Sequence, residues 1–549
     1  MRLVIIGGVA GGMSAATRAR RLDENAEIVV LEKHGYISFA NCGLPYFIAG
    51  RIKDEASLLL TDPSKVAARY RIDARVRHEV VSIDPRTKTL KVIDHERGTQ
   101  YALTYDKLIL APGASPIIPP IEHVRSVNVF QLRQVEDASA VQRYLSKHNP
   151  KHATIVGGGF IGLEMAEAMR DRGLEVTLVE RNSHALPPLD DEMAVPLHET
   201  LERHGVKLCV GRGLKALHAE LDQVTSVELD DGTIIGTDMV LMSIGVRPNV
   251  ALATDAGLKL GTSGAIAVDA YGRTSDGDIY CVGDAAEVTH GITGKPARIP
   301  LAGPANRAGR LAGEHAVTGR SDPAGKVLAT AIVQVFDCNV GMTGLGERAA
   351  RQAGFDVDTV VILPAHHVGY YPGAQTMRLK LVYEKSTGKV LGAQIVGGDG
   401  VDKRIDVIAT AIHFGGTVDD LAQLDLAYAP QFGAAKDPVH IAGFVAQNQR
   451  RHLHQAVDAN AYLSNGRLLI DVRTPAEFAL GSLTGAENIP GDTLRDRLHD
   501  IDPARPVTIF CQSGQRGYVA QRLLNQHGRT DVVNLKGGYM LAKEAGGMR

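Results

Sequence analysis

Two cysteines lie in surroundings where a thiol could do redox or sulfur-transfer chemistry, and the first is Cys42. It lies in the stretch 38–46, Ser-Phe-Ala-Asn-Cys-Gly-Leu-Pro-Tyr, just after what the sequence predicts to be a nucleotide-binding βαβ unit. The next cysteine along the chain is Cys209. A lone redox thiol can form a mixed disulfide, a persulfide or a sulfenate, but no internal disulfide. The alternative is a small buried thiol, the usual state of a free cysteine.

The second is Cys511, which ends the apolar stretch 507–510 and opens the run Cys-Gln-Ser-Gly-Gln-Arg, 511–516. A loop that leads from a strand into a helix gathers backbone N–H groups around its first residue, and Arg516 adds positive charge. Both features favour the thiolate form of Cys511. The alternative is a buried cysteine at a strand end.

A glycine-rich turn precedes the Cys42 stretch. Residues 3–6 predict a strand, residues 7–12 a turn, Ser14 onward a helix, and residues 28–31 a second strand that ends in Glu32. A helix N-terminus favours an anion such as a pyrophosphate, and a carboxylate about 20 residues further on can bind ribose hydroxyls. Position 9 is Val where the strict spacing has glycine. The predicted nucleotide contacts are Gly7, Gly8, Ala10, Gly11, Gly12, Glu32 and Lys33.

A second glycine-rich turn, 157–162, has glycine at all three required positions and follows the predicted strand 153–156. A later strand ends in Glu180, whose carboxylate would repel a 2′-phosphate and so favours NADH, although Arg181 leaves NADPH open. The alternative is a turn that binds no ligand. Two dinucleotide sites indicate a flavin plus a nicotinamide, and therefore hydride transfer. The predicted contacts are Gly157, Gly159, Phe160, Ile161, Gly162 and Glu180.

The bulk properties limit the classes of function. At 549 residues, we expect roughly three or four domains. A net charge of −2 gives no electrostatic argument for nucleic acid or a membrane surface as partner. The five widely spaced cysteines are typical of a reducing compartment, and no apolar run is long enough to span a membrane. We therefore expect a soluble cytoplasmic protein, and no metal site is predicted.

Three further segments complete a family resemblance: strand 108–110 before Ala111-Pro112-Gly113, strand 240–244 before Gly245, and 274–284, which ends in Gly283-Asp284. Over about residues 1–445 the chain resembles the FAD-dependent pyridine nucleotide-disulfide oxidoreductases. The resemblance implies that residues 1–110 and 266–320 hold FAD, that 150–265 bind NAD(P)H, and that 328–445 form an α+β dimerisation domain of a homodimer. It also implies cofactor contacts from Ala111, Pro112, Gly113, Gly245, Gly283, Asp284 and Ala302, with Asp284 at the ribityl–phosphate region.

The lone cysteine distinguishes branches of this family. Two-cysteine members carry the second thiol five residues after the first, where this chain has Phe47. NADH oxidases and peroxidases work through a cysteine sulfenate and carry a histidine in the first glycine turn, where this chain has Ala10. Coenzyme A-disulfide reductases store the thiol as a Cys–S–S–CoA mixed disulfide, and this branch fits better.

Candidate coenzyme A contacts surround the thiol. Ser14, Arg18 and Arg21 share one face of the first helix and could hold phosphates, with Ser38 and Asn41 beside the sulfur. The alternative is a solvated basic helix face. Lys436 is a further candidate phosphate contact.

The family resemblance also singles out tyrosines. Tyr370 or Tyr371, together with Tyr428, resemble the tyrosines that this family brings in from the partner subunit. Their phenols could donate hydrogen bonds to a leaving thiolate. The alternative is that they are interface-core tyrosines.

After a polar stretch, 446–459, that we interpret as a linker, residues 460–549 resemble a rhodanese domain, which carries sulfane sulfur as a cysteine persulfide. The resemblance rests on 471–473 (Asp-Val-Arg), 488–490 (Asn-Ile-Pro) and 535–539 (Leu-Lys-Gly-Gly-Tyr). The Cys-x4-Arg spacing of Cys511 and Arg516 has the length found in sulfurtransferases. Ser482 stands where many members have histidine, which bears on substrate preference.

The expected fold is therefore α/β, with two Rossmann-like domains, an α+β dimerisation domain and a C-terminal α/β rhodanese domain. The whole chain resembles the fusions of coenzyme A-disulfide reductase with rhodanese, also described as NADH-dependent persulfide reductases. This predicts an FAD- and NADH-dependent reductase of CoA persulfide, CoA polysulfide or CoA disulfide, with Cys42 and Cys511 as the working thiols. Two alternatives stay open: an oxygen or peroxide reductase, and a sulfurtransferase relay protein whose flavin part is regulatory.

Overall fold

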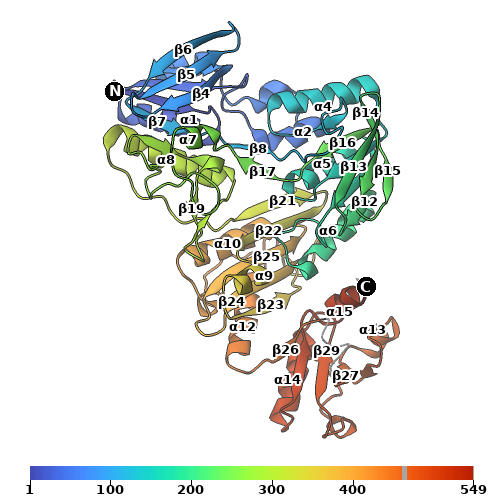
Figure 1. The fold of residues 1–549 in the computed structure, drawn as a ribbon. Coiled ribbons are helices and arrows are strands. Elements are labelled where there is room, and N and C mark those ends of the chain that lie inside the picture. Colours follow the sequence, from blue (N-terminus) through green and yellow to red (C-terminus); the bar gives the residue numbers. More distant parts are fainter. Residues whose placement is uncertain (460–465, 548–549) are drawn as a thin grey trace. The chain divides into compact units, whose positions relative to one another are not determined.

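The structure, a computed structural model, describes residues 1–459 and 466–547. It divides into two compact units: unit 1 comprises Met1–Leu186 and Leu201–Ala329, and unit 2 comprises Pro187–Thr200 and Thr330–Arg549. Figure 1 colours the chain from the N-terminus (blue) to the C-terminus (red) and labels many of its helices and strands. The predicted fold class is confirmed, because the chain combines two parallel sheets of the dinucleotide-binding kind, an antiparallel sheet with helices, and a third parallel sheet near the C-terminus.

The first sheet of unit 1 carries the N-terminal glycine turn. It has five parallel strands in the order β18-β7-β1-β2-β3. Leu3, Val4 and Ile5 in the central strand are fully buried, as expected where both faces of a parallel sheet are covered. The strands are β1 (Arg2–Ile6), β2 (Glu27–Glu32), β3 (Ile72–Val76), β7 (Lys107–Leu110) and β18 (Ile279–Cys281).

Two helices far apart in sequence pack closely beside this sheet: α1 (Ala10–Leu22) and α8 (Ala302–Thr318). A Cβ on Gly309 would lie 2.2 Å from the Gly11 carbonyl oxygen, and one on Gly313 would lie 2.4 Å from the Ala15 oxygen. The glycines therefore permit a backbone-to-backbone approach that any side chain would block. Two late segments of the chain therefore complete the N-terminal fold: β18 joins the sheet that contains β1, and α8 packs against α1.

The second sheet of unit 1 repeats the plan of the first. Its five parallel strands run in the order β12-β11-β10-β16-β9, and α4 (Val135–His148) and α5 (Phe160–Asp171) accompany it. In both sheets a glycine turn follows the middle strand. The strands are β9 (Val129–Phe130), β10 (His152–Val156), β11 (Glu175–Glu180), β12 (Val206–Val210) and β16 (Met239–Met242).

Smaller elements complete unit 1. Unit 1 also contains two three-stranded antiparallel sheets. One consists of β4 (His78–Asp84), β5 (Thr89–Asp94) and β6 (Thr99–Thr104). The other consists of β13 (Leu214–Glu220), β14 (Gln223–Leu229) and β15 (Ile234–Gly236). Two-stranded pairs are β8 (Ala114–Pro116) with β17 (Val246–Pro248), and β19 (Val288–Thr289) with β20 (Pro296–Ala297). The short helices are η1 (Asn41–Gly43), α2 (Leu44–Ala49), η2 (Glu55–Leu58), α3 (Pro63–Tyr70), α7 (Ala251–Asp255) and η3 (Gly283–Ala285).

Unit 2 contains an antiparallel sheet in the order β21-β22-β25-β24-β23. Lys380 in this sheet is 1 % exposed and forms ion pairs with Asp190, Glu192 and Glu347, so its buried charge is neutralised. The elements are α6 (Asp191–Arg203), which begins in this unit, β21 (Ala331–Val335), β22 (Cys338–Gly344), α9 (Glu347–Gln352), β23 (Val357–Ile362), β24 (Arg378–Glu384), β25 (Val390–Gly397), α10 (Val401–His413), α11 (Val418–Leu421) and α12 (Pro438–Arg450).

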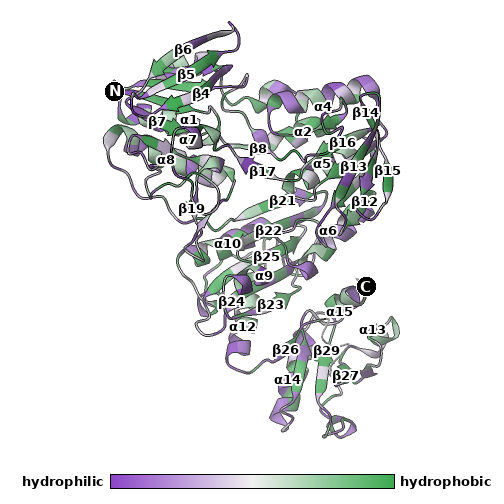
Figure 2. Ribbon diagram, viewed as in Figure 1, coloured by the Kyte–Doolittle hydropathy of each residue, from purple (hydrophilic) through white to green (hydrophobic). Residues whose placement is uncertain are grey.

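The C-terminal part of unit 2 is a five-stranded parallel sheet in the order β26-β30-β29-β27-β28. In Figure 2, β29 is coloured hydrophobic, and all four of its residues are buried. The elements are β26 (Ala456–Val457), β27 (Leu468–Asp471), α13 (Pro475–Ala479), β28 (Glu487–Asn488), η5 (Leu498–Asp500), β29 (Val507–Phe510), α14 (Gln515–Gln526), β30 (Val532–Leu535) and α15 (Gly538–Gly547).

The segment 446–459, predicted as a linker, is different in the structure. It forms the end of α12, through Arg450, and the edge strand β26. Its polar residues suggested a solvated connection, but Gln447 donates to Asp419 (2.8 Å) and Gln449 accepts from Tyr383 (3.0 Å). The polar side chains of this segment therefore form hydrogen bonds within a folded unit. Residue 460, the predicted start of the last domain, lies outside the described residues.

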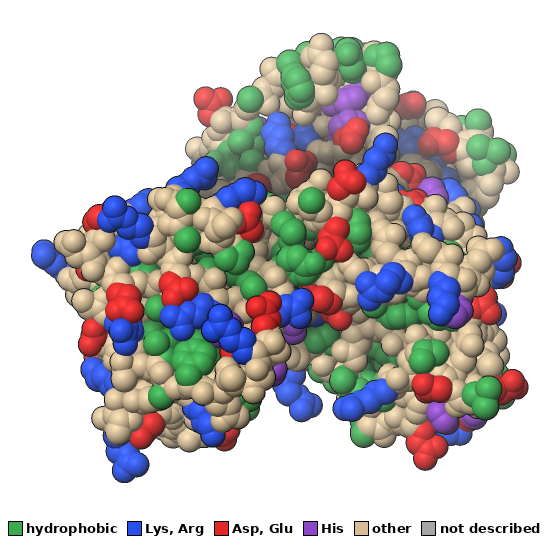
Figure 3. Space-filling view, turned by 90° about the horizontal axis from the view of Figure 1, so that it is seen from above, with side chains coloured by type: hydrophobic (Ala, Val, Ile, Leu, Met, Phe, Trp, Pro, Cys, Tyr) green, Lys and Arg blue, Asp and Glu red, His purple; other side chains and the backbone are tan. Residues whose placement is uncertain are grey.

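Charged side chains of both signs are interspersed on the face seen in Figure 3, which agrees with a net charge near zero. Among the described residues, no helix is both long enough and apolar enough to cross a bilayer. Over the same residues, no group of three or more His, Cys, Asp and Glu side chains is arranged to hold a metal ion.

Candidate redox and sulfur-transfer sites

The first glycine turn has the geometry that close approach to a phosphate requires. Gly7 has φ +100°, and a Cβ there would lie 2.1 Å from the Ala111 oxygen; a Cβ on Gly12 would lie 1.9 Å from the Gly7 oxygen. The N–H of Gly8 donates to Glu32 at 2.8 Å. The turn therefore brings the start of α1 and the carboxylate at the end of β2 to the same edge of the sheet, where a dinucleotide fits.

The second glycine turn repeats this geometry. Gly157 has φ +106°, a Cβ on Gly162 would lie 1.9 Å from the Gly157 oxygen, and the N–H of Gly158 donates to Glu180 at 2.8 Å. Gly159 has no heavy atom within 4 Å of a Cβ position, so the space beside it is open to a ligand. Val9 holds the corresponding position in the first turn. Both turns thus fit a dinucleotide.

The other predicted cofactor residues lie where strands end, although their roles stay predictions. Ala111, Pro112 and Gly113 follow β7; Gly245 follows β16; Gly283 and Asp284 lie in η3 after β18; Ala302 begins α8; and Lys33 is exposed after β2. Asp284 forms an ion pair with Arg133 at 2.7 Å. Sequence reasoning missed Arg133, because it belongs to no motif and its partner lies 151 residues away.

Cys42 lies in η1, at the start of α2, and is exposed. Its sulfur lies 3.8 Å from the side-chain oxygen of Asn41. The N–H of Ser38 donates to the Gly8 oxygen at 2.8 Å, and Ser38 has φ +47°, which is unusual for a residue with a side chain. The Cys42 stretch is therefore tied directly to the first glycine turn, so the thiol is placed beside the first dinucleotide site.

A carboxyl group that sequence reasoning missed acts electrostatically on Cys42. Partial burial raises the pKa of the Cys42 thiol, and the charge of Glu164 raises it further. Glu164 lies in α5, where burial raises its own pKa to about 7, and it accepts a hydrogen bond from Tyr46 at 3.4 Å. The only signal in the sequence was its place two residues after Gly162. Cys42 is thus a thiol whose ionisation is opposed by its protein surroundings.

The predicted coenzyme A face of α1 lies against α8. Ser14 donates to Asn306 (2.6 Å), and Arg18 forms an ion pair with Glu314 (2.5 Å). Arg21, one turn further along, is exposed. We predicted that this face could hold the phosphates of coenzyme A, and that role stays a prediction. Arg18 has a carboxylate partner in the structure, whereas Arg21 is exposed.

The structure brings together two of the predicted tyrosines. The hydroxyls of Tyr370 and Tyr428 lie 3.0 Å apart, and this hydrogen bond raises the pKa of Tyr428. Their residues are 75 % and 45 % exposed, so they are not core tyrosines of this chain. Tyr371 packs edge-on against the His367 ring, and Lys436 is exposed.

The Cys511 loop is prearranged around its sulfur. Cys511 is 1 % exposed, and its Sγ accepts a hydrogen bond from the N–H of Gly514 at 3.2 Å. Gly514 has φ +102°, which favours glycine. A Cβ on Gly538 would lie 2.3 Å from the Cys511 oxygen, so the following strand–helix turn also presses against this loop.

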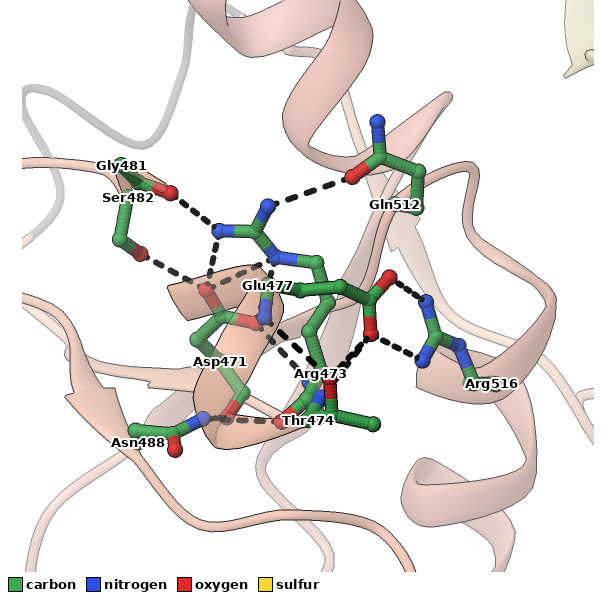
Figure 4. A network of polar contacts seen from close by, with 9 residues as sticks. All are labelled: Asp471, Arg473, Thr474, Glu477, Gly481, Ser482, Asn488, Gln512 and Arg516. Atoms are coloured by element: carbon green, nitrogen blue, oxygen red, sulfur yellow. Dashed lines mark hydrogen bonds and ion pairs between the residues drawn. The ribbon is translucent and has the colours of Figure 1, made fainter. Parts of the chain in front are cut away.

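A buried ion pair, Asp471 with Arg473, is hydrogen-bonded to the Cys511 loop (Figure 4). Asp471 and Arg473 are 0 % and 2 % exposed and are bonded to each other at 2.7 Å. Arg473 also donates to the side chain of Gln512, the residue after Cys511, at 3.2 Å, and it lies over the Tyr539 ring at 4.1 Å. Ser482, which stands where many rhodaneses have histidine, donates to Asp471 at 2.7 Å.

Arg516 is also paired. We expected its charge to act on Cys511, and Cys511 is among the groups that raise the Arg516 pKa. Both terminal nitrogens also donate to Glu477, at 2.6 and 2.8 Å (Figure 4). Glu477 was missed because it lies 39 residues before its partner. Both arginines at the loop therefore have a carboxylate partner.

Comparison with known protein families divides the chain in the same way. Residues 1–309 match the model of the pyridine nucleotide-disulphide oxidoreductases, 330–438 match the dimerisation domain of the same family, and 452–545 match a rhodanese-like domain.

Individual relatives agree over most of their length. A Methanocaldococcus jannaschii protein named NADH oxidase is 35 % identical over 80 % of this chain and 98 % of its own, and a Pyrococcus horikoshii NAD(P)H coenzyme A polysulfide/persulfide reductase is 36 % identical over 80 % and 96 %. The solved structure of reduced Bacillus anthracis CoADR-RHD covers 99 % of this chain and 98 % of its own, with 43 % identity and a TM-score of 0.96. That of an NAD-dependent persulfide reductase from A. fulgidus covers 98 % and 100 %, with 37 % identity and a TM-score of 0.93.

Proposed function

Because the chain belongs to the pyridine nucleotide-disulphide oxidoreductase family and carries a rhodanese-like domain, we propose that it is an FAD- and NADH-dependent reductase of sulfane sulfur. Its substrates are CoA persulfide, CoA polysulfide or CoA disulfide. The observation that carries this proposal is the hydrogen bond from Ser38 to Gly8, which ties the lone redox cysteine to a dinucleotide turn. Relatives that carry reductase names of this kind support it.

The chain's own residues have defined tasks toward the cofactors. The first glycine turn, Glu32 and Asp284 would hold FAD; the second glycine turn and Glu180 would hold the nicotinamide nucleotide. The Glu180 carboxylate is buried and would repel a 2′-phosphate, which favours NADH over NADPH. When bound, FAD supplies the two-electron chemistry that links NADH to a disulfide at Cys42.

The sulfur chemistry falls to the two thiols. The Cys42 thiolate attacks the CoA-bound sulfur of CoA–S–SH, which forms Cys42–S–S–CoA and releases HS⁻; two electrons then split this disulfide into the Cys42 and CoA thiolates. The candidate contacts to CoA are Ser14, Arg18, Arg21, Ser38, Asn41 and Lys436. In a homodimer, the phenols of Tyr370 and Tyr428 would come from the partner and stabilise the leaving thiolate.

Oxygen or peroxide reduction is the competing function, since one relative bears the name NADH oxidase. Ala10, the first residue of α1, offers no imidazole at the turn where the peroxide-reducing branch has one. We therefore place this function second.

The deciding experiment is anaerobic NADH consumption with CoA persulfide, CoA disulfide or hydrogen peroxide. We expect turnover with the sulfur substrates, and a fall of at least about 10³-fold in Cys42→Ser. Cys511→Ser should still reduce CoA persulfide supplied directly. Cys209→Ala, at a buried cysteine in β12, is the matched control and should keep its activity. Faster turnover with peroxide, or an active Cys42→Ser, would contradict the proposal.

A further inference from the structure

The Glu477 carboxylate is held rigidly at the loop that carries Cys511. Its Oε2 accepts hydrogen bonds from the N–H and hydroxyl of Thr474, both at 3.0 Å, and from Arg516 at 2.8 Å, while Oε1 accepts from Arg516 at 2.6 Å. Thr474 and Glu477 form the capping box of α13. The carboxylate therefore cannot easily move away from the guanidinium (Figure 4).

Arg516 is the cation next to the reactive sulfur. The hydrogen bonds that Arg516 donates to Glu477 are the main cause that raises the Arg516 pKa, and Cys511 raises it further. The same contact lowers the pKa of Glu477 to about 2, so this carboxylate is ionised at any ordinary pH. The pair is one-third to one-half exposed, at the surface where a donor must approach.

The second arginine at the loop is neutralised as well. Arg473 is bonded to the buried Asp471, and its remaining donors reach Gly481 (2.7 Å) and Gln512 (3.2 Å). These four side chains carry two positive and two negative charges, which cancel. A dianion would find no unmatched guanidinium among them.

We propose that Glu477 determines which sulfane donors Cys511 accepts, by holding Arg516 in a neutral pair that disfavours thiosulfate and admits organic persulfides. This inference rests on the proposed function and names the donor class for its second cysteine. Thiosulfate is a dianion whose transferred sulfur is bound directly to an anionic sulfonate, and that group leaves as the dianion sulfite. CoA persulfide has a neutral pantetheine arm next to its sulfane sulfur, and its phosphates lie at the far end.

Both transfers are simple displacements. With a persulfide, Cys511–S⁻ + R–S–SH gives Cys511–S–SH + R–S⁻: the new bond joins the Cys511 sulfur to the terminal sulfur of the donor, and the S–S bond of the donor breaks. With thiosulfate, Cys511–S⁻ + S–SO₃²⁻ gives Cys511–S–S⁻ + SO₃²⁻. Only the second brings a sulfonate against the Glu477 carboxylate, and that repulsion is the basis of the discrimination.

The test uses the full-length, FAD-loaded protein in a Cys42→Ser background, without NADH, so that only Cys511 turns over. Thiosulfate or CoA persulfide is the donor, cyanide the acceptor, and thiocyanate the product measured. Glu477→Gln keeps the capping box, because glutamine also serves at that position, but removes the charge. Glu487→Gln, at an exposed residue of the same domain, is the matched control.

We expect Glu477→Gln to raise kcat/KM for thiosulfate by about fivefold to tenfold, with less than a twofold change for CoA persulfide. The gain should shrink at high ionic strength and disappear in Glu477→Gln/Arg516→Gln, because it needs the released guanidinium. Wild-type turnover of thiosulfate as fast as CoA persulfide would overturn the proposal. Equal effects on both donors, or a gain that survives the loss of Arg516, would also overturn it. NADH consumption by the protein that retains Cys42 is measured separately. Its absence would contradict the proposed reductase function, whereas the thiocyanate assay tests only the donor preference of Cys511.

Discussion

Cys42 and Cys511 are the same chemical group in opposite surroundings. The Cys42 residue is exposed at the surface, but its thiol is partly enclosed by protein. This partial burial, first, and the charge of Glu164, second, raise the pKa of the thiol. Cys511 is almost completely buried, yet its sulfur accepts a backbone N–H and has Arg516 beside it. Exposure alone therefore does not show which groups surround each thiol.

The two sites differ in where the groups that surround the thiol come from. The Cys511 loop carries its own supports, because the N–H of Gly514 and the Asp471–Arg473 pair belong to one small domain. Cys42 follows a stretch that is bonded to the first glycine turn, and under the proposed function a bound cofactor and substrate would complete its surroundings. Substitutions should therefore affect the two thiols independently.

The largest effect is expected from Asp471→Ala. It leaves the Arg473 charge buried without its partner, which should lower the free energy of unfolding of the C-terminal domain by about 3–5 kcal/mol. Limited proteolysis or hydrogen exchange of that domain measures this change, and Asp492→Ala, at an exposed residue, is the control. Reductase activity at Cys42 should persist, and its loss would show that the two thiols are not independent.

Gly514→Ala should have the next largest effect. The backbone there has φ +102°, so alanine is strained by about 1–2 kcal/mol. The N–H that bonds the Cys511 sulfur should shift, and alkylation of Cys511 should slow. Gly491→Ala is the control, since a Cβ there meets atoms no closer than 3.7 Å. Unchanged alkylation of Cys511 would refute the role of this N–H.

Ser482→Ala removes one hydrogen bond to Asp471, which keeps its bonds to Arg473. We expect a loss of about 1 kcal/mol in domain stability. The alkylation rate of Cys511 should stay the same, because the loop is held through Arg473. A large fall in that rate would mean that Ser482 acts on the thiol and not only on the buried pair.

The smallest effect concerns Cys42 and its dependence on pH. Burial raises the pKa of Glu164 to about 7, so its carboxyl is neutral below that pH and ionised above it. Ionised Glu164 opposes the Cys42 thiolate, so Glu164→Gln should speed alkylation of Cys42 about two- to fivefold at pH 8 and change it little at pH 6. The measurement uses the FAD-loaded, reduced protein, with Glu175→Gln as the control. An equal effect at both pH values would contradict this account.

Features that depend on a few neighbouring residues were predictable. Both glycine turns, the lone Cys42 and the Cys511 loop were located correctly, because each is built by one strand, one turn and one helix in succession. The polar segment 446–459 was interpreted as a linker because hydrophilicity alone does not show that Gln447 and Gln449 bond to Asp419 and Tyr383.

The amino-acid sequence by itself determined the fold class, the two dinucleotide turns and the two thiols, since local periodicity and spacing suffice for these. Only the tertiary structure decided what surrounds each thiol. Glu164 meets Tyr46 across 118 residues, Arg133 meets Asp284 across 151, and Glu477 meets Arg516 across 39. Electrostatic partners act through distance in space, and the distance between two side chains in space is set by how the sheets and helices pack, not by their separation along the chain.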